Sequence, residues 1–165
     1  MIDNRFECEA ERLLLENGYE GVVFLVNSSY DLALVGVTSN RRAVYNYELM
    51  VEYLINEEGF IDEYEARDFI DYNTLRALPY FGKGAPIVYY PKDYEKQSIL
   101  EFLDDHCFSE KTSLIEGLDE SFLGVTEDGS ALYDSALAEK LLPGVSLDDY
   151  SSLNYPPIFV SILSK

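Results

Sequence analysis

The feature that most constrains this chain is a segment that occurs twice at a constant spacing. Residues 34–38 read Leu-Val-Gly-Val-Thr and are followed by Ala-Val-Tyr at 43–45. Residues 122–126 read Phe-Leu-Gly-Val-Thr and are followed by Ala-Leu-Tyr at 131–133, so the offset is 88 throughout. Chance similarity is the alternative, since Gly, Val and Thr are common in β-hairpins. The unchanged spacing favours a duplication and predicts a fold of two related units.

Each copy has the pattern of a β-hairpin that leads into a helix. The second turn contains Asp128-Gly129, a strong hairpin signal, which supports the same interpretation of Thr38-Ser39-Asn40-Arg41 in the first copy. Asn46 and Asp134 then occupy equivalent N-cap positions, and the patterns predict helices over 47–55 and 135–142. Strands that follow a proline, at 86–90 and 157–160, are expected to close the two units.

The other predicted elements are a helix over 5–16, a short buried strand over 22–26, a helix over 62–76 that the second copy lacks, and a helix over 93–104. The fold class is therefore α+β, a tandem duplication of a hairpin-helix-strand unit. We expect an antiparallel or mixed sheet, or two sheets, with the helices packed on one face. The first unit spans 1–91 and the second 92–165, and the two are expected to pack as one compact domain.

The charge of the chain restricts its partners. It has 31 acidic and 12 basic residues, a net charge of −19. Residues 1–91 contribute −9 and residues 92–165 contribute −10, so the excess is not confined to a tail. Such a surface repels phosphates and anionic lipids, which disfavours direct binding to nucleic acid or membrane and favours a basic protein partner.

The cysteines and the apolar runs indicate a compartment. Cys8 and Cys107 are too few for a disulfide scaffold. The first residues show no basic segment followed by an apolar one, as an export signal would. The longest apolar run, 22–26, is far shorter than the roughly 20 residues of a membrane helix. These features predict a cytoplasmic protein with free thiols.

The residue types do not form a recognisable catalytic or metal site. The single histidine, His106, precedes Cys107, and adjacent residues of a helix point in different directions, which places the pair poorly as a nucleophile and base. The Cys and His spacings fit no zinc site, and no run of acids fits a calcium loop. We expect no cofactor and no enzyme activity. An enzyme would require several acids that converge in a cleft.

Residues 81–86 (Phe-Gly-Lys-Gly-Ala-Pro) form one glycine-rich loop. Backbone amides around such glycines, together with a lysine, could bind an anion. The loop precedes a strand and lacks the spacing of a phosphate-binding motif, so we interpret it as a connector.

Tyrosines interleaved with acids are the candidate binding residues. Tyrosine is abundant, with 14 residues, and it suits half-buried positions at the edge of a core. The alternative is that rigid aromatic rings among carboxylates form a protein-binding surface. The candidates for that surface are Tyr47, Glu48, Glu57, Glu58, Asp62, Glu63, Tyr64, Asp148, Asp149 and Tyr150.

Residues 30–91 resemble a family of small acidic proteins encoded by bacteriophages and prophages of gut Firmicutes. The resemblance rests on Ala43-Val44-Tyr45 and on the stretch from Arg76-Ala77-Leu78-Pro79-Tyr80 to Ala85-Pro86-Ile87. It implies a phage context, and hence the cytoplasm of a host bacterium. It implies no catalytic residues.

Together these observations predict a non-enzymatic, acidic protein-binding protein of phage origin. One form of this hypothesis is a DNA mimic, whose carboxylates replace phosphates in the groove of a host nucleic-acid-binding enzyme. The alternative is a structural or interaction module, or a homodimer, whose acidity only provides solubility.

Overall fold

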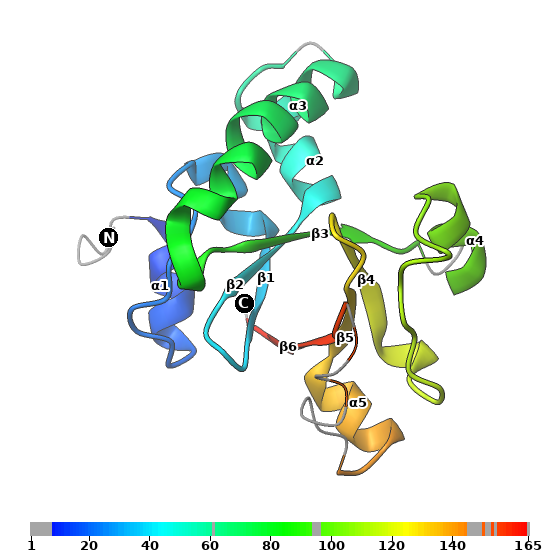
Figure 1. The fold of residues 1–165 in the computed structure, drawn as a ribbon. Coiled ribbons are helices and arrows are strands. Elements are labelled where there is room, and N and C mark those ends of the chain that lie inside the picture. The colour runs from blue at the N-terminus through cyan, green and yellow to red at the C-terminus, as the bar shows by residue number, and fades with distance from the viewer. Residues whose placement is uncertain are drawn as a thin grey trace. The chain divides into compact units, whose positions relative to one another are not determined.

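The computed structural model describes residues 8–60, 62–93, 97–144, 150, 153 and 155–164 (Figure 1). The chain forms two compact units: residues 1–88 with 162–165, and residues 89–161. The boundaries between the units fall inside two strands, β3 (Ile87–Pro91) and β6 (Ile158–Ile162). Each unit is therefore described by itself below.

The predicted sheet with helices on one face is wrong. The strands follow one another in the order β1-β2-β3-β4-β5-β6 and close into a barrel, in which β5 and β6 are parallel while β1–β2, β3–β4 and β4–β5 are antiparallel. The chain does contain both helices and strands. Closure has a physical reason. An open sheet leaves two edge strands with unpaired backbone groups, and a closed barrel has no such edges.

The two predicted hairpins are present and share their irregularities. In the first unit β1 (Leu34–Thr38) pairs with β2 (Ala43–Asn46), and in the second β4 (Phe122–Thr126) pairs with β5 (Ala131–Asp134). The register shifts between Leu34 and Gly36 in one copy and between Phe122 and Gly124 in the other. Bulges that recur at equivalent residues support the duplication, because a bulge is an inherited feature of a strand pair.

The hairpin turns also have the same hydrogen bonds. The Thr38 hydroxyl bonds with Asn40 and accepts from the Arg42 amide, and the Thr126 hydroxyl bonds with Asp128 and accepts from the Ser130 amide. The left-handed residue is Arg41 (φ 64°) in one turn and Gly129 (φ 95°) in the other. In the first turn this conformation falls on Arg41 and not on the neighbouring Asn40, although asparagine adopts it more readily.

A capped helix follows each hairpin. In α2 (Tyr47–Glu57) the Asn46 side chain accepts from the Leu49 amide, and in α5 (Ser135–Leu141) the Asp134 side chain accepts from the Ala136 and Leu137 amides. Both N-caps were predicted from the sequence and are confirmed. Each cap satisfies amides that have no partner within the helix.

A long helical run that only the first unit has follows α2. It consists of α3 (Glu63–Phe69), a π-helical turn η2 (Ile70–Thr74) and a 3₁₀ segment η3 (Leu75–Gly84). Figure 1 shows these turns as one continuous run beside α2. We call residues Glu63–Gly84 the helical arm. The predicted helix over 62–76 is present, begins with Asp62 as its N-cap and extends further than expected.

The remaining helices precede the hairpins. They are α1 (Glu9–Glu16) and η1 (Ser28–Ala33) in the first unit, and α4 (Ile99–Asp105) and η4 (Asp119–Ser121) in the second. The helices predicted over 5–16 and 93–104 correspond to α1 and α4, although residues 5–7 and 94–96 lie outside the described part. The strand predicted over 22–26 is wrong: this segment is irregular, with Val22 and Leu25 buried.

In each unit a tyrosine hydroxyl accepts a hydrogen bond from a buried residue that lies before the hairpin and outside any helix or strand. The Leu25 amide donates to Tyr45 Oη at 3.0 Å, and the Ile115 amide donates to Tyr133 Oη at 2.9 Å. Burial raises the pKa of Tyr133 to about 12, and it raises the pKa of Tyr45 as well. Both hydroxyls therefore stay neutral acceptors for buried amides that have no strand partner.

Replacing either tyrosine with phenylalanine is expected to destabilise the protein. Tyr45→Phe and Tyr133→Phe each leave a buried amide without its acceptor, which costs about 1–3 kcal/mol of unfolding free energy. Urea denaturation followed by circular dichroism measures this loss. Tyr64→Phe, which removes an exposed hydroxyl, is the control and should change little. Equal stability of all three variants would contradict a supporting role for the buried hydroxyls.

Candidate functional site

Two of the acidic candidates of the first unit, Glu48 and Glu63, bind one arginine. Arg67 of α3 donates to both carboxylate oxygens of Glu48, at 2.9 and 2.7 Å, and its Nε donates to Glu63 at 2.9 Å. Its guanidinium carbon lies 5.4 Å from the centre of the Tyr47 ring. Tyr47, Glu48 and Glu63 therefore lie together. They form a binding site that is occupied by the guanidinium group of Arg67.

The Tyr47 side chain is buried within this cluster, with 3% of its surface exposed. Its hydroxyl donates to Asp71 Oδ1 at 2.9 Å. Burial, followed by the bond to Asp71, raises the pKa of Tyr47, so the hydroxyl remains a donor. Tyr47 thus holds the arm against α2, and its ring is not part of the exposed surface.

The other candidates lie in different places. Glu57 and Glu58 at the end of α2, Asp62 at the start of α3, and Glu63 and Tyr64 are all exposed. Asp62 also caps α3 by accepting from the Glu65 amide at 2.8 Å. Tyr150 belongs to the second unit and is half-buried, whereas Asp148 and Asp149 lie outside the described residues.

The exposed aromatic side chains gather on the helical arm. Among the described residues the aromatics with large exposed surfaces are Tyr64 (80%), Tyr72 (65%), Tyr80 (89%) and Phe81 (45%), and all belong to the arm. A folded chain ordinarily buries such rings, and exposed tyrosines are common anchors of protein interfaces. Of these four residues, only Tyr64 is among the candidates predicted from the sequence.

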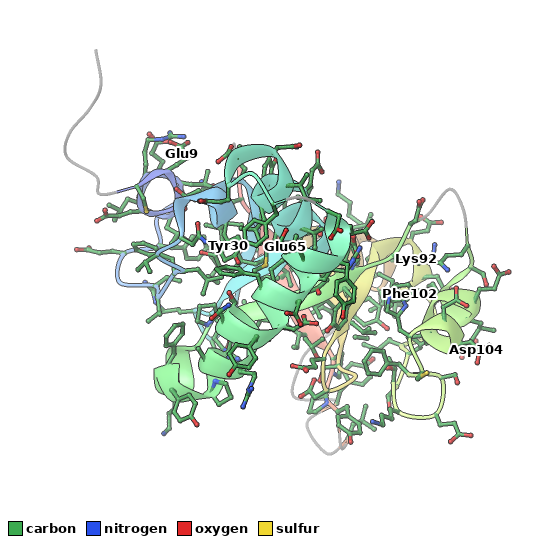
Figure 2. The ribbon with its side chains drawn as sticks, turned by 90° about the horizontal axis from the view of Figure 1, so that it is seen from above. Glu9, Tyr30, Glu65, Lys92, Phe102 and Asp104 are labelled. Carbon is green, nitrogen blue, oxygen red and sulfur yellow. The ribbon has the colours of Figure 1, made fainter. Side chains whose placement is uncertain are left out.

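Tyr64, Asp68 and Tyr72 occupy one side of the arm. They are four residues apart, and residues at this spacing are neighbours on a helix surface. The buried residues Ala66 and Ile70 lie on the opposite side. Figure 2 labels Glu65, which is adjacent to Tyr64 and also exposed. We call Tyr64, Glu65, Asp68 and Tyr72 the Tyr64–Tyr72 face. The four-residue spacing of Tyr64, Asp68 and Tyr72 is the signal in the sequence that identifies this face.

Charge is distributed unevenly along the arm. Residues 63–72 hold four acids and one arginine, whereas residues 73–84 hold Arg76 and Lys83 and no acid. Arg76 lies over the Tyr72 ring, with 4.8 Å between the guanidinium carbon and the ring centre. Both halves of the arm therefore carry exposed aromatics, but the first half is acidic and the second half is basic.

Cys8 and His106 make hydrogen bonds with the backbone of their own helices. The Cys8 sulfur accepts from the Glu11 amide as the N-cap of α1, and burial raises the pKa of its thiol, which disfavours the reactive thiolate. His106 Nδ1 lies 3.0 Å from the Phe102 carbonyl oxygen, and its ring lies 4.4 Å from the Phe102 ring. Both cysteines are free.

Residues 81–86 lead from the helical arm into β3. Gly82 has a positive φ (82°) and interrupts η3 two residues before its end, and the chain then enters β3. Within the described part of the chain, no group of three or more His, Cys, Asp or Glu side chains is placed to hold a metal ion. A shallow cavity of about 630 Å³ in the second unit is lined by residues that include Lys92, Ser98 and Asp119.

Asp31 is the one buried acid among the described residues of the first unit. It is 5% exposed, and its Oδ2 accepts from the Glu9 amide at 3.1 Å. No described group donates to Oδ1. Burial raises the pKa of the Asp31 carboxyl, and hydrogen bonds from the Ala10 and Glu9 amides oppose this only in part. Asp31 thus joins η1 to the start of α1. Burial makes the ionised form of its carboxyl less favourable than it is in water.

The raised pKa of Asp31 predicts how stability depends on pH. A folded-state pKa above the unfolded value means that the folded state binds the proton more tightly, so stability falls as pH rises through the interval between the two values. Asp31→Asn removes this titration while retaining an oxygen that accepts from Glu9. The stability of the variant relative to the native chain should therefore rise across that interval. Urea denaturation at a series of pH values tests this, and a pH-independent difference would contradict it.

No protein-family model, curated protein or solved structure matches this chain. The resemblance to phage proteins therefore stays a prediction. In the described part of the chain no helix has the length and apolar character needed to span a membrane.

Proposed function

We propose that this protein is a non-enzymatic binding protein whose acidic surface recognises a basic surface of another protein. One observation carries the proposal: Tyr64 and Tyr72, two of the four aromatics with large exposed surfaces among the described residues, lie in the acidic first half of the helical arm. Aromatic anchors supply binding energy when they are covered, and surrounding charge speeds the encounter with an oppositely charged partner.

The net charge of −19 supports the same choice of partner. Long-range attraction at this charge favours basic proteins and disfavours phosphates. The phage context implied by the resemblance suggests a host protein as the target. The narrower form of the proposal is DNA mimicry, in which the protein occupies the nucleic-acid groove of a host enzyme.

Affinity purification at two salt concentrations tests the proposal. The immobilised protein is incubated with a Firmicutes lysate at about 0.05 M and about 0.5 M salt, since screening weakens exposed charge pairs. We expect basic proteins to be retained at low salt and released at high salt. Recombinant versions of the retained proteins should then bind the purified chain directly. Retention of no basic protein would overturn the proposal.

Two further measurements distinguish DNA mimicry from other modes of binding, and binding of a basic partner from the homodimer alternative. Duplex DNA should displace the chain from its partner if the chain occupies a nucleic-acid groove, and it should not do so if binding occurs elsewhere. Light scattering measures the mass of the purified chain. A homodimer that binds no basic protein at low salt would indicate the alternative, in which acidity serves solubility alone.

A further inference from the structure

We infer that the Tyr64–Tyr72 face is the docking surface for arginine side chains of the partner. This inference rests on the proposed function and makes it specific, because it assigns both the contact residues and the cation. Arginine is preferred to lysine here for a geometric reason. Its planar guanidinium can stack on a tyrosine ring while it also donates to a carboxylate.

The chain itself provides an example of this chemistry. Arg67 lies over the Tyr47 ring and donates two hydrogen bonds to Glu48 and two to Glu63. One ring and two carboxylates thus hold one guanidinium group. This internal site shows how tyrosine and acidic side chains of α2 and α3 together bind arginine.

The Tyr64–Tyr72 face repeats these residue types on the exposed side of the arm. Tyr64 and Tyr72 are eight residues apart, which is about two turns of the helical arm. The exposed Asp68 lies between them in the sequence and on the same side, and Glu65 adds a second carboxylate near Tyr64. Two rings with intervening carboxylates suit two arginines on a partner surface.

Arg76 already lies over one of these rings. Its guanidinium carbon is 4.8 Å from the centre of the Tyr72 ring. An arginine of the partner therefore has to displace Arg76 from Tyr72 and also meets its positive charge. The structure thus contains an internal competitor whose removal should strengthen binding, whereas removal of a residue from a docking surface ordinarily weakens it.

Labelled deca-arginine and deca-lysine peptides provide matched probes, because they differ in the cation but not in charge. Fluorescence anisotropy with the full-length chain should show tighter binding of deca-arginine by about 5-fold, because a lysine over a tyrosine ring cannot stack and donate to a carboxylate at once as a planar guanidinium does. Binding of neither peptide would count against the proposed function itself. Equal binding of both would overturn the arginine inference and leave the proposed function standing.

Substitutions of the two rings locate the preference. Tyr64→Leu with Tyr72→Leu keeps apolar surface but removes the aromatic faces, and the ratio of the two affinities should fall to within about twofold. Tyr64→Phe with Tyr72→Phe keeps the faces and should preserve the ratio. All four changes are at exposed positions, so folding measured by circular dichroism should be unaffected. An unchanged ratio in the leucine variant would overturn the inference.

Charge-matched variants test the position of the acids. Glu65→Gln with Asp68→Asn should weaken deca-arginine binding more than Glu101→Gln with Asp104→Asn, a pair of exposed acids on α4. Both variants lose two negative charges, so equal weakening would indicate that total charge alone decides binding and would overturn the inference.

The internal competitor supplies the last test. Arg76→Gln should strengthen deca-arginine binding by about two- to fivefold, the equivalent of one exposed cation–π contact. Lys83→Gln removes the same charge from the same arm and is the control. An equal gain in both variants, or no gain in Arg76→Gln, would contradict a docking role for Tyr72.

Discussion

The Gly124→Ala variant is expected to lose about 3 kcal/mol of unfolding free energy, because the added methyl group overlaps the backbone of the neighbouring strand. Gly124 of β4 pairs with Pro91 of β3. A Cβ atom at this position would overlap the Tyr90 carbonyl oxygen and lie 2.9 Å from its carbon. Backbone atoms cannot rotate away as a side chain can, so β3 and β4 would have to separate.

The backbone conformation of Gly124 adds to this effect. Its φ is 156°, and residues with a side chain rarely adopt positive values. Gly59→Ala is the control: Gly59 also has a positive φ, of 74°, but a Cβ there meets no atom within 4 Å. Urea denaturation measures the unfolding free energy of both variants. The difference between their losses is the contribution of the steric overlap at Gly124, since both variants share the unfavourable φ. Equal losses would contradict the importance of the close approach of β3 to β4.

The Phe122→Ala variant is expected to lose about 3–5 kcal/mol, as is usual for a buried ring that is removed from a core. Phe122 is fully buried in the second unit. Its ring makes edge contacts with the rings of Phe102, at 6.0 Å between centres, and Tyr133, at 5.9 Å. Removing it leaves a cavity beside the rings of Phe102 on α4 and Tyr133 on β5, and both of these rings lose contacts.

The duplicated sequence provides the control for this prediction. Leu34 occupies the equivalent position in the first unit and is also fully buried. Phe122→Leu should therefore lose much less than Phe122→Ala, since leucine fills most of the space. Thermal unfolding followed by near-ultraviolet circular dichroism of the tyrosines measures both. Similar losses of stability in Phe122→Leu and Phe122→Ala would contradict the prediction, because they would show that stability does not depend on the volume of the side chain at position 122.

Local patterns predicted most of the secondary structure. The repeated segments identified both hairpins, and Asn46 and Asp134 identified the starts of the helices that follow. These signals depend on neighbouring residues only. The run at 22–26 misled because an apolar stretch has the same composition whether its backbone pairs with a strand or, as at Leu25, donates to the Tyr45 side chain.

The candidate surface was predicted in part. The sequence identified acidic and tyrosine-rich segments on α2 and α3, which include the exposed Tyr64. It could not show that the Tyr47 ring is buried under Arg67, since that contact joins two helices. Nor did it identify Tyr72 as exposed, because Tyr47 and Tyr72 differ in their tertiary surroundings and not in residue type.

The sequence by itself determined the duplication, the hairpins with their capped helices, and the acidity, because these follow from spacing, local hydrogen bonding and composition. Only the tertiary structure decided how the strands join and which tyrosines remain exposed. Closure of a barrel depends on pairing between strand edges that lie far apart in the chain, and exposure depends on which helix covers which ring. Neither property is encoded in a local pattern of residues.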